Sequence, residues 1–172
     1  NDQDATMFLR TAELDSNNNA VFPIKQGIAG AGAVSQKAFA CLNDDALFLS
    51  RDGVFGLDSN SVTMQRSIQL RSYYVNPRLI AEDNLNMACA AVWRGYYVLC
   101  VNGHAYVADS RQTNVNPMGS TGYEWYYWTN IPARTITEYD GDLFFGSDDG
   151  DVYKMKTYSQ NGVLAYSDNG IP

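Results

Sequence analysis

The residues that could do acid–base or nucleophilic chemistry are few in this chain. His104 is the only histidine, and it directly follows an Asn-Gly pair. A serine or cysteine nucleophile needs such a base beside it, and no Gly-x-Ser-x-Gly sequence is present. The sequence therefore predicts that His104 is a surface or packing residue. It also predicts a protein that is not an enzyme and that carries no cofactor.

The three cysteines, Cys41, Cys89 and Cys100, have no Cys-x-x-Cys spacing. Each lies in an apolar run, which predicts small buried side chains rather than ligands. A bridge between Cys89 and Cys100 across neighbouring strands is the alternative. With a single histidine, the chain has too few ligands for a zinc site, and we expect no metal.

Acidic residues suggest two further kinds of site. Asp140-Gly-Asp142 and the run 148–151 could bind calcium, although neither follows the Asp-x-Asp-x-Asp-Gly loop, and turn chemistry alone explains them. Paired carboxylates could hydrolyse glycosides, and Glu138 lies on an expected strand. An ion pair between Glu138 and Arg134 is the simpler interpretation.

The densest aromatic patch is the run Tyr123–Trp128. Strand alternation places its odd-numbered rings on one face and its even-numbered rings on the other. Such faces can stack sugars, but they also fill the space between packed sheets, which we favour. The polar segment before it, residues 110–122, is expected to be a surface loop. We take as the candidate interaction surface Tyr123, Trp125, Tyr127, Arg111, Asn114 and Asn116.

The elements around these residues repeat along the chain. The stretches 46–58, 96–109 and 142–155 each contain an apolar run, an Asp-Gly or Asn-Gly pair and an alternating run. The glycines of these pairs, Gly53, Gly103 and Gly150, lie 50 and 47 residues apart. Asp-Gly and Asn-Gly pairs favour hairpin turns, so each stretch predicts a β-hairpin. An aromatic residue follows each turn, at Phe55, Tyr106 and Tyr153.

Each hairpin is flanked by further expected strands. Those before it are Lys37–Leu42, Met87–Trp93 and Arg134–Tyr139, and those after it are Thr63–Leu70, Tyr123–Thr129 and Gly162–Ser167. Four short antiparallel strands every 45 to 50 residues is the spacing of a propeller blade.

The sequence thus predicts an all-β, β-propeller-like domain over residues 1–172, with about three four-stranded antiparallel blades. The expected units are residues 24–70, 86–130 and 133–167, after N-terminal strands in residues 1–23 that are split by a turn at 15–19. Residues 77–86 could form a short helix after Pro77. Because a closed propeller needs about four blades or more, we expect a partial propeller or a fragment.

Charge and hydropathy exclude several classes of partner. The net charge is −7 and no basic run is present, which argues against nucleic acid. No apolar stretch approaches the ~18 residues of a membrane span. The excess of Asp, Asn and Gly over Glu and Lys is typical of a turn-rich β protein.

Parts of the sequence resemble tailed-bacteriophage tail or neck proteins, of the stabilisation-protein type, that carry β-propeller modules. The resemblance covers roughly residues 20–157 and is carried by QGIAGAGAVSQKAF, LFLSRDGVF, QRSIQLR and WRGYYVLCVNGHAYVAD, which begin at Gln26, Leu47, Gln65 and Trp93. It implies a virion structural protein, assembled in the bacterial cytoplasm as a homo-oligomer in contact with other virion proteins of the neck or tail. No catalytic residue carries over from that family.

The chain departs from the family pattern by ending at Pro172, soon after the third unit, which favours a fragment. A carbohydrate-binding or glycan-cleaving propeller for host adsorption is the alternative function. A calcium-stabilised module is the third.

Overall fold

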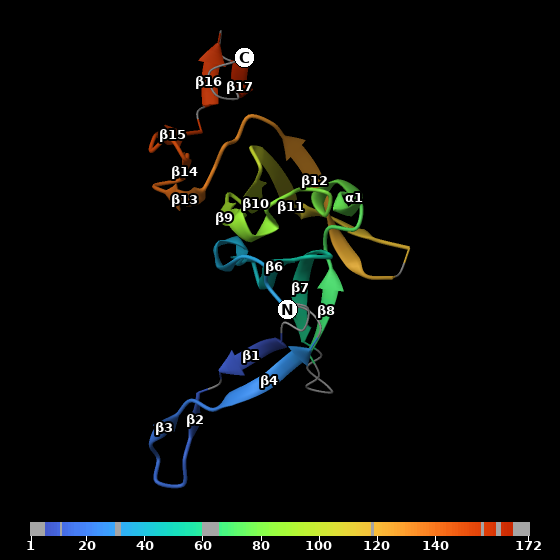
Figure 1. The fold of residues 1–172 in the computed structure, drawn as a ribbon, viewed down its shortest axis with the longest axis vertical. Coiled ribbons are helices and arrows are strands. Elements are labelled where there is room, and N and C mark those ends of the chain that lie inside the picture. The colour runs from blue at the N-terminus through green and yellow to red at the C-terminus, as the bar shows by residue number, and fades with distance from the viewer. Residues whose placement is uncertain are drawn as a thin grey trace.

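The fold is built almost entirely from antiparallel β-strands (Figure 1). The computed structural model describes residues 6–10, 12–29, 32–59, 66–117, 119–155, 157–160 and 163–166. The all-β prediction is therefore confirmed. Within these residues, no helix is long and apolar enough to cross a membrane.

Two four-stranded sheets form the centre of the molecule, and in each the strands follow one another in chain order. The first sheet contains β5 (Ala40–Leu42), β6 (Asp45–Ser50), β7 (Gly53–Ser59) and β8 (Arg66–Leu70). The second sheet contains β9 (Cys89–Trp93), β10 (Tyr96–Val101), β11 (His104–Val115) and β12 (Thr121–Trp128). Between them lie helix α1 (Asn76–Leu79) and the 3₁₀ turn η3 (Leu85–Met87), and a second 3₁₀ turn, η2 (Gln36–Ala38), precedes the first sheet.

The third repeat forms a smaller sheet than the sequence predicts. The third sheet has three strands, β13 (Thr135–Tyr139), β14 (Asp142–Gly146) and β15 (Val152–Lys154). The segment expected as its fourth strand contains β17 (Val163–Tyr166), which pairs with β16 (Thr157–Gln160) in a separate two-stranded sheet. The prediction of a fourth strand here was wrong because that strand finds its hydrogen-bond partner in a local hairpin.

The N-terminal strands also pair among themselves. The turn at residues 15–19 joins β2 (Glu13–Leu14) to β3 (Ala20–Val21), as predicted, and Oδ1 of Asp15 accepts hydrogen bonds from the backbone N–H groups of Asn17 and Asn19. Next to them β1 (Thr6–Arg10) pairs with β4 (Ile24–Ala29). The first sheet therefore begins at β5, and β4 is not one of its strands.

Of the three Asx-Gly pairs that the repeat singled out, only Asn102-Gly103 forms a two-residue turn. Asn102 and Gly103 have φ values of 50° and 78° and join β10 to β11. In the first sheet the turn residues are Arg51 and Asp52, and Gly53 already belongs to β7. In the third sheet residues 147–151 form a longer connection.

The repeat is clearest at the turns between the first and second strands of each sheet. These turns are Asn43-Asp44, Arg94-Gly95 and Asp140-Gly141, each closed by a directly opposed pair of residues. Asn43, Arg94 and Asp140 have φ values of 55°, 49° and 52°. Non-glycine residues adopt this region readily only when they are short and polar, so Arg94 at such a position could not be anticipated from its type.

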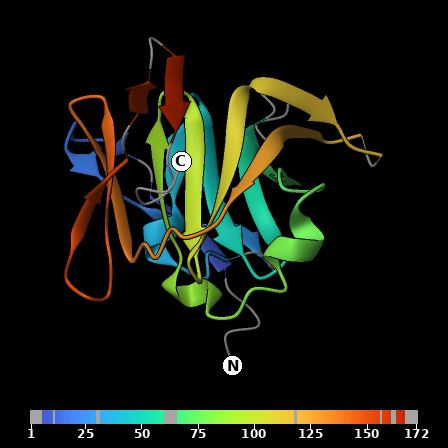
Figure 2. The same ribbon diagram turned by 90° about the horizontal axis from the view of Figure 1, so that it is seen from above.

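The three sheets pack face to face in series through two apolar cores. The first core, between the first and second sheets, includes Leu47, Leu49, Tyr97, Leu99 and Tyr106. The second core, between the second and third sheets, includes Val98, Cys100, Val107, Leu143 and Phe145. Both faces of the second sheet are thus covered, as Figure 2 shows from above.

Each sheet uses equivalent positions to contact its neighbours. Counting from the first turn of each sheet, the third and fifth residues of the second strand are Leu47 and Leu49 in the first sheet and Val98 and Cys100 in the second. Leu47 and Leu49 face the second sheet, whereas Val98 and Cys100 face the third. The equivalent residues of the third sheet are Phe144 and Gly146, and they lie on the face turned away from the second core.

Candidate functional site

The aromatic strand β12 contributes to both cores. Tyr123, Trp125 and Tyr127 pack against the first core, whereas Trp128 packs against the second. The expected alternation and the filling of space between sheets are therefore present. Tyr126 is 42% exposed and its hydroxyl accepts a hydrogen bond from Gln112.

A polar cluster at the margin of the first core joins the first sheet to the second. The guanidinium of Arg71, just after β8, donates from Nε to Oδ2 of Asp45 on β6 over 2.8 Å. The Tyr123 hydroxyl donates to the same oxygen over 2.8 Å. From the same face of β12, Trp125 Nε1 donates to the backbone carbonyl of Arg71 over 2.9 Å. The Tyr123 hydroxyl and the Trp125 ring N–H therefore bond to the first sheet and to the residue that follows its last strand.

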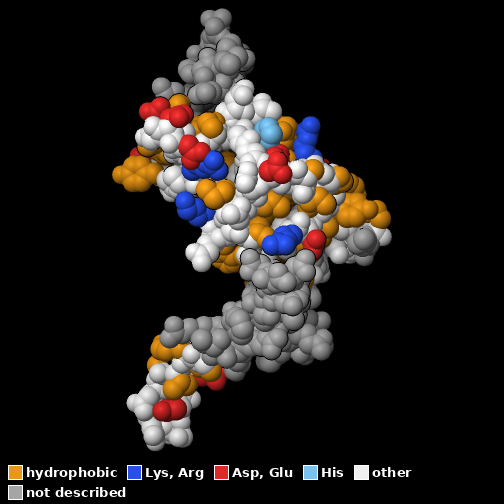
Figure 3. All heavy atoms as spheres, in the orientation of Figure 1, with side chains coloured by type: hydrophobic (Ala, Val, Ile, Leu, Met, Phe, Trp, Pro, Cys, Tyr) orange, Lys and Arg blue, Asp and Glu red, His pale blue; other side chains and the backbone are white. Residues whose placement is uncertain are grey.

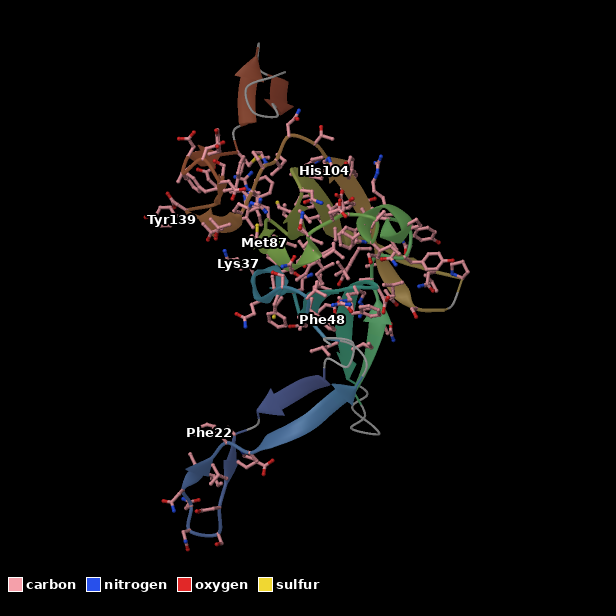
Figure 4. All side chains as sticks on the ribbon, viewed as in Figure 1. Phe22, Lys37, Phe48, Met87, His104 and Tyr139 are labelled. Carbon is pink, nitrogen blue, oxygen red and sulfur yellow. The ribbon has the colours of Figure 1, made fainter. Side chains whose placement is uncertain are left out.

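His104 belongs to a second polar cluster, centred on Glu82. Its Nδ1 lies 2.7 Å from Oε1 of Glu82, and the Tyr106 hydroxyl donates to the same oxygen over 2.7 Å. Asn102 donates to the other carboxylate oxygen over 3.2 Å. Figure 4 labels His104 on the upper part of the second sheet.

The electrostatics of this cluster favour the ionised carboxylate. Burial alone would raise the pKa of Glu82, but the hydrogen bonds from Tyr106, His104 and Asn102 more than offset it, and the net pKa is lowered. Burial and the bond to Glu82 raise the pKa of Tyr106. Because the carboxylate oxygens are already occupied by donors, the cluster holds the segment after α1 against β11.

The Tyr127 ring extends this cluster toward solvent. The guanidinium carbon of Arg78 lies 4.1 Å from the ring centroid, and the rings of His104 and Tyr106 each lie 5.2 Å from it. A cation over a tyrosine face is a stabilising arrangement of charge and ring quadrupole. Tyr127 thus has neighbours from α1 and β11 around it.

The segment expected as a polar surface loop is mostly strand. Residues 110–115 continue β11, and β12 begins at Thr121, with an irregular register between Asp109 and Thr113. The resulting hairpin arm extends beyond the body of the second sheet, as the yellow and orange ribbon in Figure 2 shows. The loop prediction was wrong because these residues form a strand pair whose side chains are mostly polar. Such a pair lacks the alternation of apolar and polar residues by which a sequence indicates a strand.

The remaining residues of the expected interaction surface lie on this arm and at its base. Arg111 is exposed, pairs with the buried Asp109 at 2.8 Å and lies over the Tyr96 ring. Asn114 donates to Oε1 of Glu124 over 2.8 Å. Asn116 is buried and its Oδ1 accepts from the backbone N–H of Ser120 over 3.0 Å. The structure thus separates the expected surface into rings that face the first sheet and polar residues of the arm.

The residues considered for calcium binding or glycoside hydrolysis have other partners. Asp142 pairs with Lys154, and Asp148 pairs with Arg134 at 2.6 Å. Glu138 accepts a hydrogen bond from the backbone N–H of Gly141 over 2.6 Å. The expected ion pair between Glu138 and Arg134 was therefore wrong, since Arg134 turns to the 147–151 connection. Among the residues that the structure describes, no group of three or more His, Cys, Asp or Glu side chains is arranged to hold a metal ion.

The outer face of the third sheet is a feature that the sequence analysis missed. Tyr139 and Val152 are each 74% exposed on this face, and Phe144 is half-buried beneath the Lys154 ammonium. Figure 4 labels Tyr139 at the outer margin of the molecule, and Figure 3 shows an exposed apolar patch at that margin. The alternation of the strand 135–139 could have revealed it, because Ile136 is buried whereas Thr135, Thr137 and Tyr139 are exposed.

Comparison with known proteins adds no family to this description. No protein-family model matches the sequence, and no curated protein matches it.

Proposed function

We propose that this protein is a non-enzymatic structural component of a phage virion, in which stacked β-sheets serve as a protein–protein interaction module. The three sheets act as successive blades of a propeller-like stack. The sequence resemblance to phage tail and neck proteins supports the virion setting, and the serial packing of the sheets supports the interaction role. Other neck or tail proteins, and further copies of the same protein in the particle, are the partners.

The observation that carries the proposal is the outer face of the third sheet, on which Tyr139 and Val152 are exposed and which none of the other described sheets covers. In the first and second sheets the equivalent face packs against the next sheet through Leu47, Leu49, Val98 and Cys100. In the third sheet the same face leaves the large side chain of Tyr139 exposed. Exposed apolar patches of this kind mark interaction sites. The occupant that fits is another antiparallel sheet with bulky apolar side chains on its facing strand.

The facing strand of that partner can be described from the existing interfaces. The second sheet offers Tyr97 and Leu99 to the first, and the third sheet offers Leu143 and Phe145 to the second. These pairs occupy the second and fourth positions after the corresponding turns. We expect the partner strand to carry a pair of the same chemistry, two residues apart.

Site-specific photo-cross-linking in infected bacteria tests the proposal. A benzophenone amino acid replaces Tyr139 in the protein, and in a control it replaces Asn86, which is exposed on η3. Cross-linking to a virion protein from position 139, mapped to a strand with the expected apolar pair, is the predicted result. Absence of cross-links above the Asn86 control, in particles that contain the protein, would overturn the interaction role.

The carbohydrate alternative makes a different prediction for Trp125. Glycan binding that disappears in Trp125→Phe, without loss of folding, would favour the alternative. The structure places the Trp125 ring against the first core and its N–H on Arg71. We therefore expect Trp125→Phe to lower stability and to leave an array of bacterial surface glycans unbound, as with the unmodified protein.

A further inference from the structure

Two cysteines that the proposed function does not use face each other on neighbouring strands. Cys89 on β9 lies directly opposite Cys100 on β10 in the antiparallel register. Both thiols are free and both side chains belong to the second core, so they point to the same side of the sheet. Directly opposed residues of antiparallel strands have Cα atoms about 4.5–5.5 Å apart. A disulfide spans about 4.4–6.8 Å between Cα atoms, so this separation is suitable.

The third cysteine differs from the pair in its surroundings. Cys41 was expected to be buried like the other two, but it is exposed on β5. Its strand has one face on the first core and the other toward solvent, and alternation places Cys41 outward. Cys89 and Cys100 are 2% and 0% exposed. Cys41 therefore provides an internal standard for a freely accessible thiol.

The position of Cys89 gives the pair a route to small reagents. β9 is an edge strand of the second sheet, and Cys89 is its first residue. Its Sγ contacts the backbone carbonyl of Ala133 at 3.8 Å, in the irregular segment that connects β12 to β13. Ends of edge strands and irregular covering segments open locally at lower free energy than the whole domain. Exposure of Cys89 thus requires fraying of one strand end and not global unfolding.

The two thiols also differ in acidity in the order that disulfide exchange needs. A hydrogen bond with Cys100 lowers the pKa of Cys89, and Lys37 and Arg134 act in the same direction, against burial. The same hydrogen bond and burial raise the pKa of Cys100. The thiolate is the nucleophile of exchange, so Cys89 is suited to attack first.

We propose that Cys89 and Cys100 form a reversible disulfide by exchange with a small-molecule disulfide, and that this bond fastens the edge strand β9 to β10. The Cys89 thiolate attacks one sulfur of the reagent and expels one thiolate, which leaves a mixed disulfide at Cys89. Cys100, as a thiolate, then attacks Sγ of Cys89 and expels the second thiolate. The protein loses two electrons and two protons, and the reagent is reduced to two thiols.

The test uses the full chain in native buffer with oxidised glutathione as the reagent. Remaining thiols are blocked with N-ethylmaleimide before digestion without reductant. Trypsin cleaves after Arg78, Arg94 and Arg111, so Cys89 and Cys100 fall on separate peptides, residues 79–94 and 95–111. The expected product is a disulfide-linked pair of these peptides, lighter by two hydrogen atoms than their sum, which dithiothreitol separates.

Two variants make the result specific. Cys41→Ala should give the same linked pair, whereas Cys41→Ala with Cys100→Ala should give at most a glutathione adduct at Cys89. Amide hydrogen exchange in β9 should slow on oxidation, while exchange in β5, which lies in another sheet, should not change.

Either of two results would overturn the proposal. In one, the unmodified chain carries glutathione on Cys41 while Cys89 and Cys100 both stay free and react with maleimide only after unfolding. In the other, the linked pair forms in urea but not in native buffer. The unmodified chain is itself tested, so the result still decides the proposal if a variant does not fold. The proposal does not depend on the virion role, and photo-cross-linking at position 139 has no bearing on it.

Discussion

Tyr123 and Asp45 lie 78 residues apart in the chain, and the tyrosine hydroxyl donates a 2.8 Å hydrogen bond to Oδ2 of that aspartate. Arg71 donates to the same oxygen, so one carboxylate joins β6, β12 and the segment after β8. Asp45 and Arg71 have side chains that are only 13% and 10% exposed. The interface between the first and second sheets is therefore an apolar core with a cluster of hydrogen-bonded polar side chains, Asp45, Arg71 and Tyr123, at its margin.

Removal of the Tyr123 hydroxyl tests how much this polar cluster contributes to the stability of the fold. Tyr123→Phe keeps the ring on the first core but deletes a hydrogen bond to a charged acceptor, which typically contributes about 1.5–3 kcal/mol. We expect the free energy of unfolding in urea to fall by that amount. Tyr126→Phe is the matched control, because that tyrosine is exposed on the opposite face of β12. Equal effects of the two substitutions would contradict a stabilising role for the hydrogen bond between Tyr123 and Asp45.

Glu82 should make stability depend on pH in the acidic range. Its pKa in the folded protein is lowered from the ordinary value of 4.5, so its ionised form stabilises the fold above that value. This contribution is lost as the pH falls through the lowered folded pKa, where the folded carboxylate also takes up a proton. Glu82→Gln should therefore be less stable than the unmodified chain at neutral pH.

The difference between the two proteins, measured by urea unfolding at a series of pH values, should shrink toward acid. Glu124→Gln on β12 is the control, because that carboxylate is exposed and accepts one hydrogen bond from Asn114. A constant difference between the Glu82 variant and the unmodified chain across the acidic range would argue against a stabilising ionised carboxylate.

The two faces of the third sheet should respond differently to truncation. Leu143 is 1% exposed in the second core, and replacement of such a leucine by alanine costs about 2–5 kcal/mol. Val152 is 74% exposed on the outer face, so Val152→Ala should change the free energy of unfolding by no more than about 0.5 kcal/mol. Thermal and urea unfolding of both variants check this contrast. A large loss in Val152→Ala would mean that the outer face is covered.

Two glycines at positive φ should differ in their tolerance of alanine. Gly103 has a φ of 78° and open space where a Cβ would lie, so Gly103→Ala costs only the backbone term of roughly 1–2 kcal/mol. A Cβ on Gly53 would lie 2.1 Å from Oδ1 of Asn76 and 2.7 Å from Oγ of Ser72. Gly53→Ala should therefore lower the melting temperature more than Gly103→Ala, and the reverse order would contradict the packing around Gly53.

The sequence predicted strands and turns correctly where the conformational preferences of neighbouring residues decide the structure. The apolar run before Asn102-Gly103 forms β10, because that pair can adopt the two positive φ values of a tight turn. The same reasoning failed at Asp149-Gly150, where a longer connection forms. An Asx-Gly pair permits a tight turn, but the pairing of the flanking strands decides which residues occupy it.

Polar clusters could not be predicted from residue types and spacing. Glu82 precedes His104 by 22 residues, and no local pattern links them. Their contact exists because α1 returns the chain to the second sheet beside β11. The structure gives the isolated histidine a carboxylate partner that the sequence analysis did not identify.

By itself the sequence determined the all-β class and its repeat, because strand alternation and turn residues act over a few neighbouring positions. Tertiary structure decided which strands share a sheet, so that β17 pairs with β16 and β4 with β1. It also decided which face of each sheet is covered. The alternation at Tyr139 marks two faces, but only the packing of the second sheet against Leu143 and Phe145 shows which of them remains exposed. That choice depends on contacts between distant segments, which no short sequence pattern specifies.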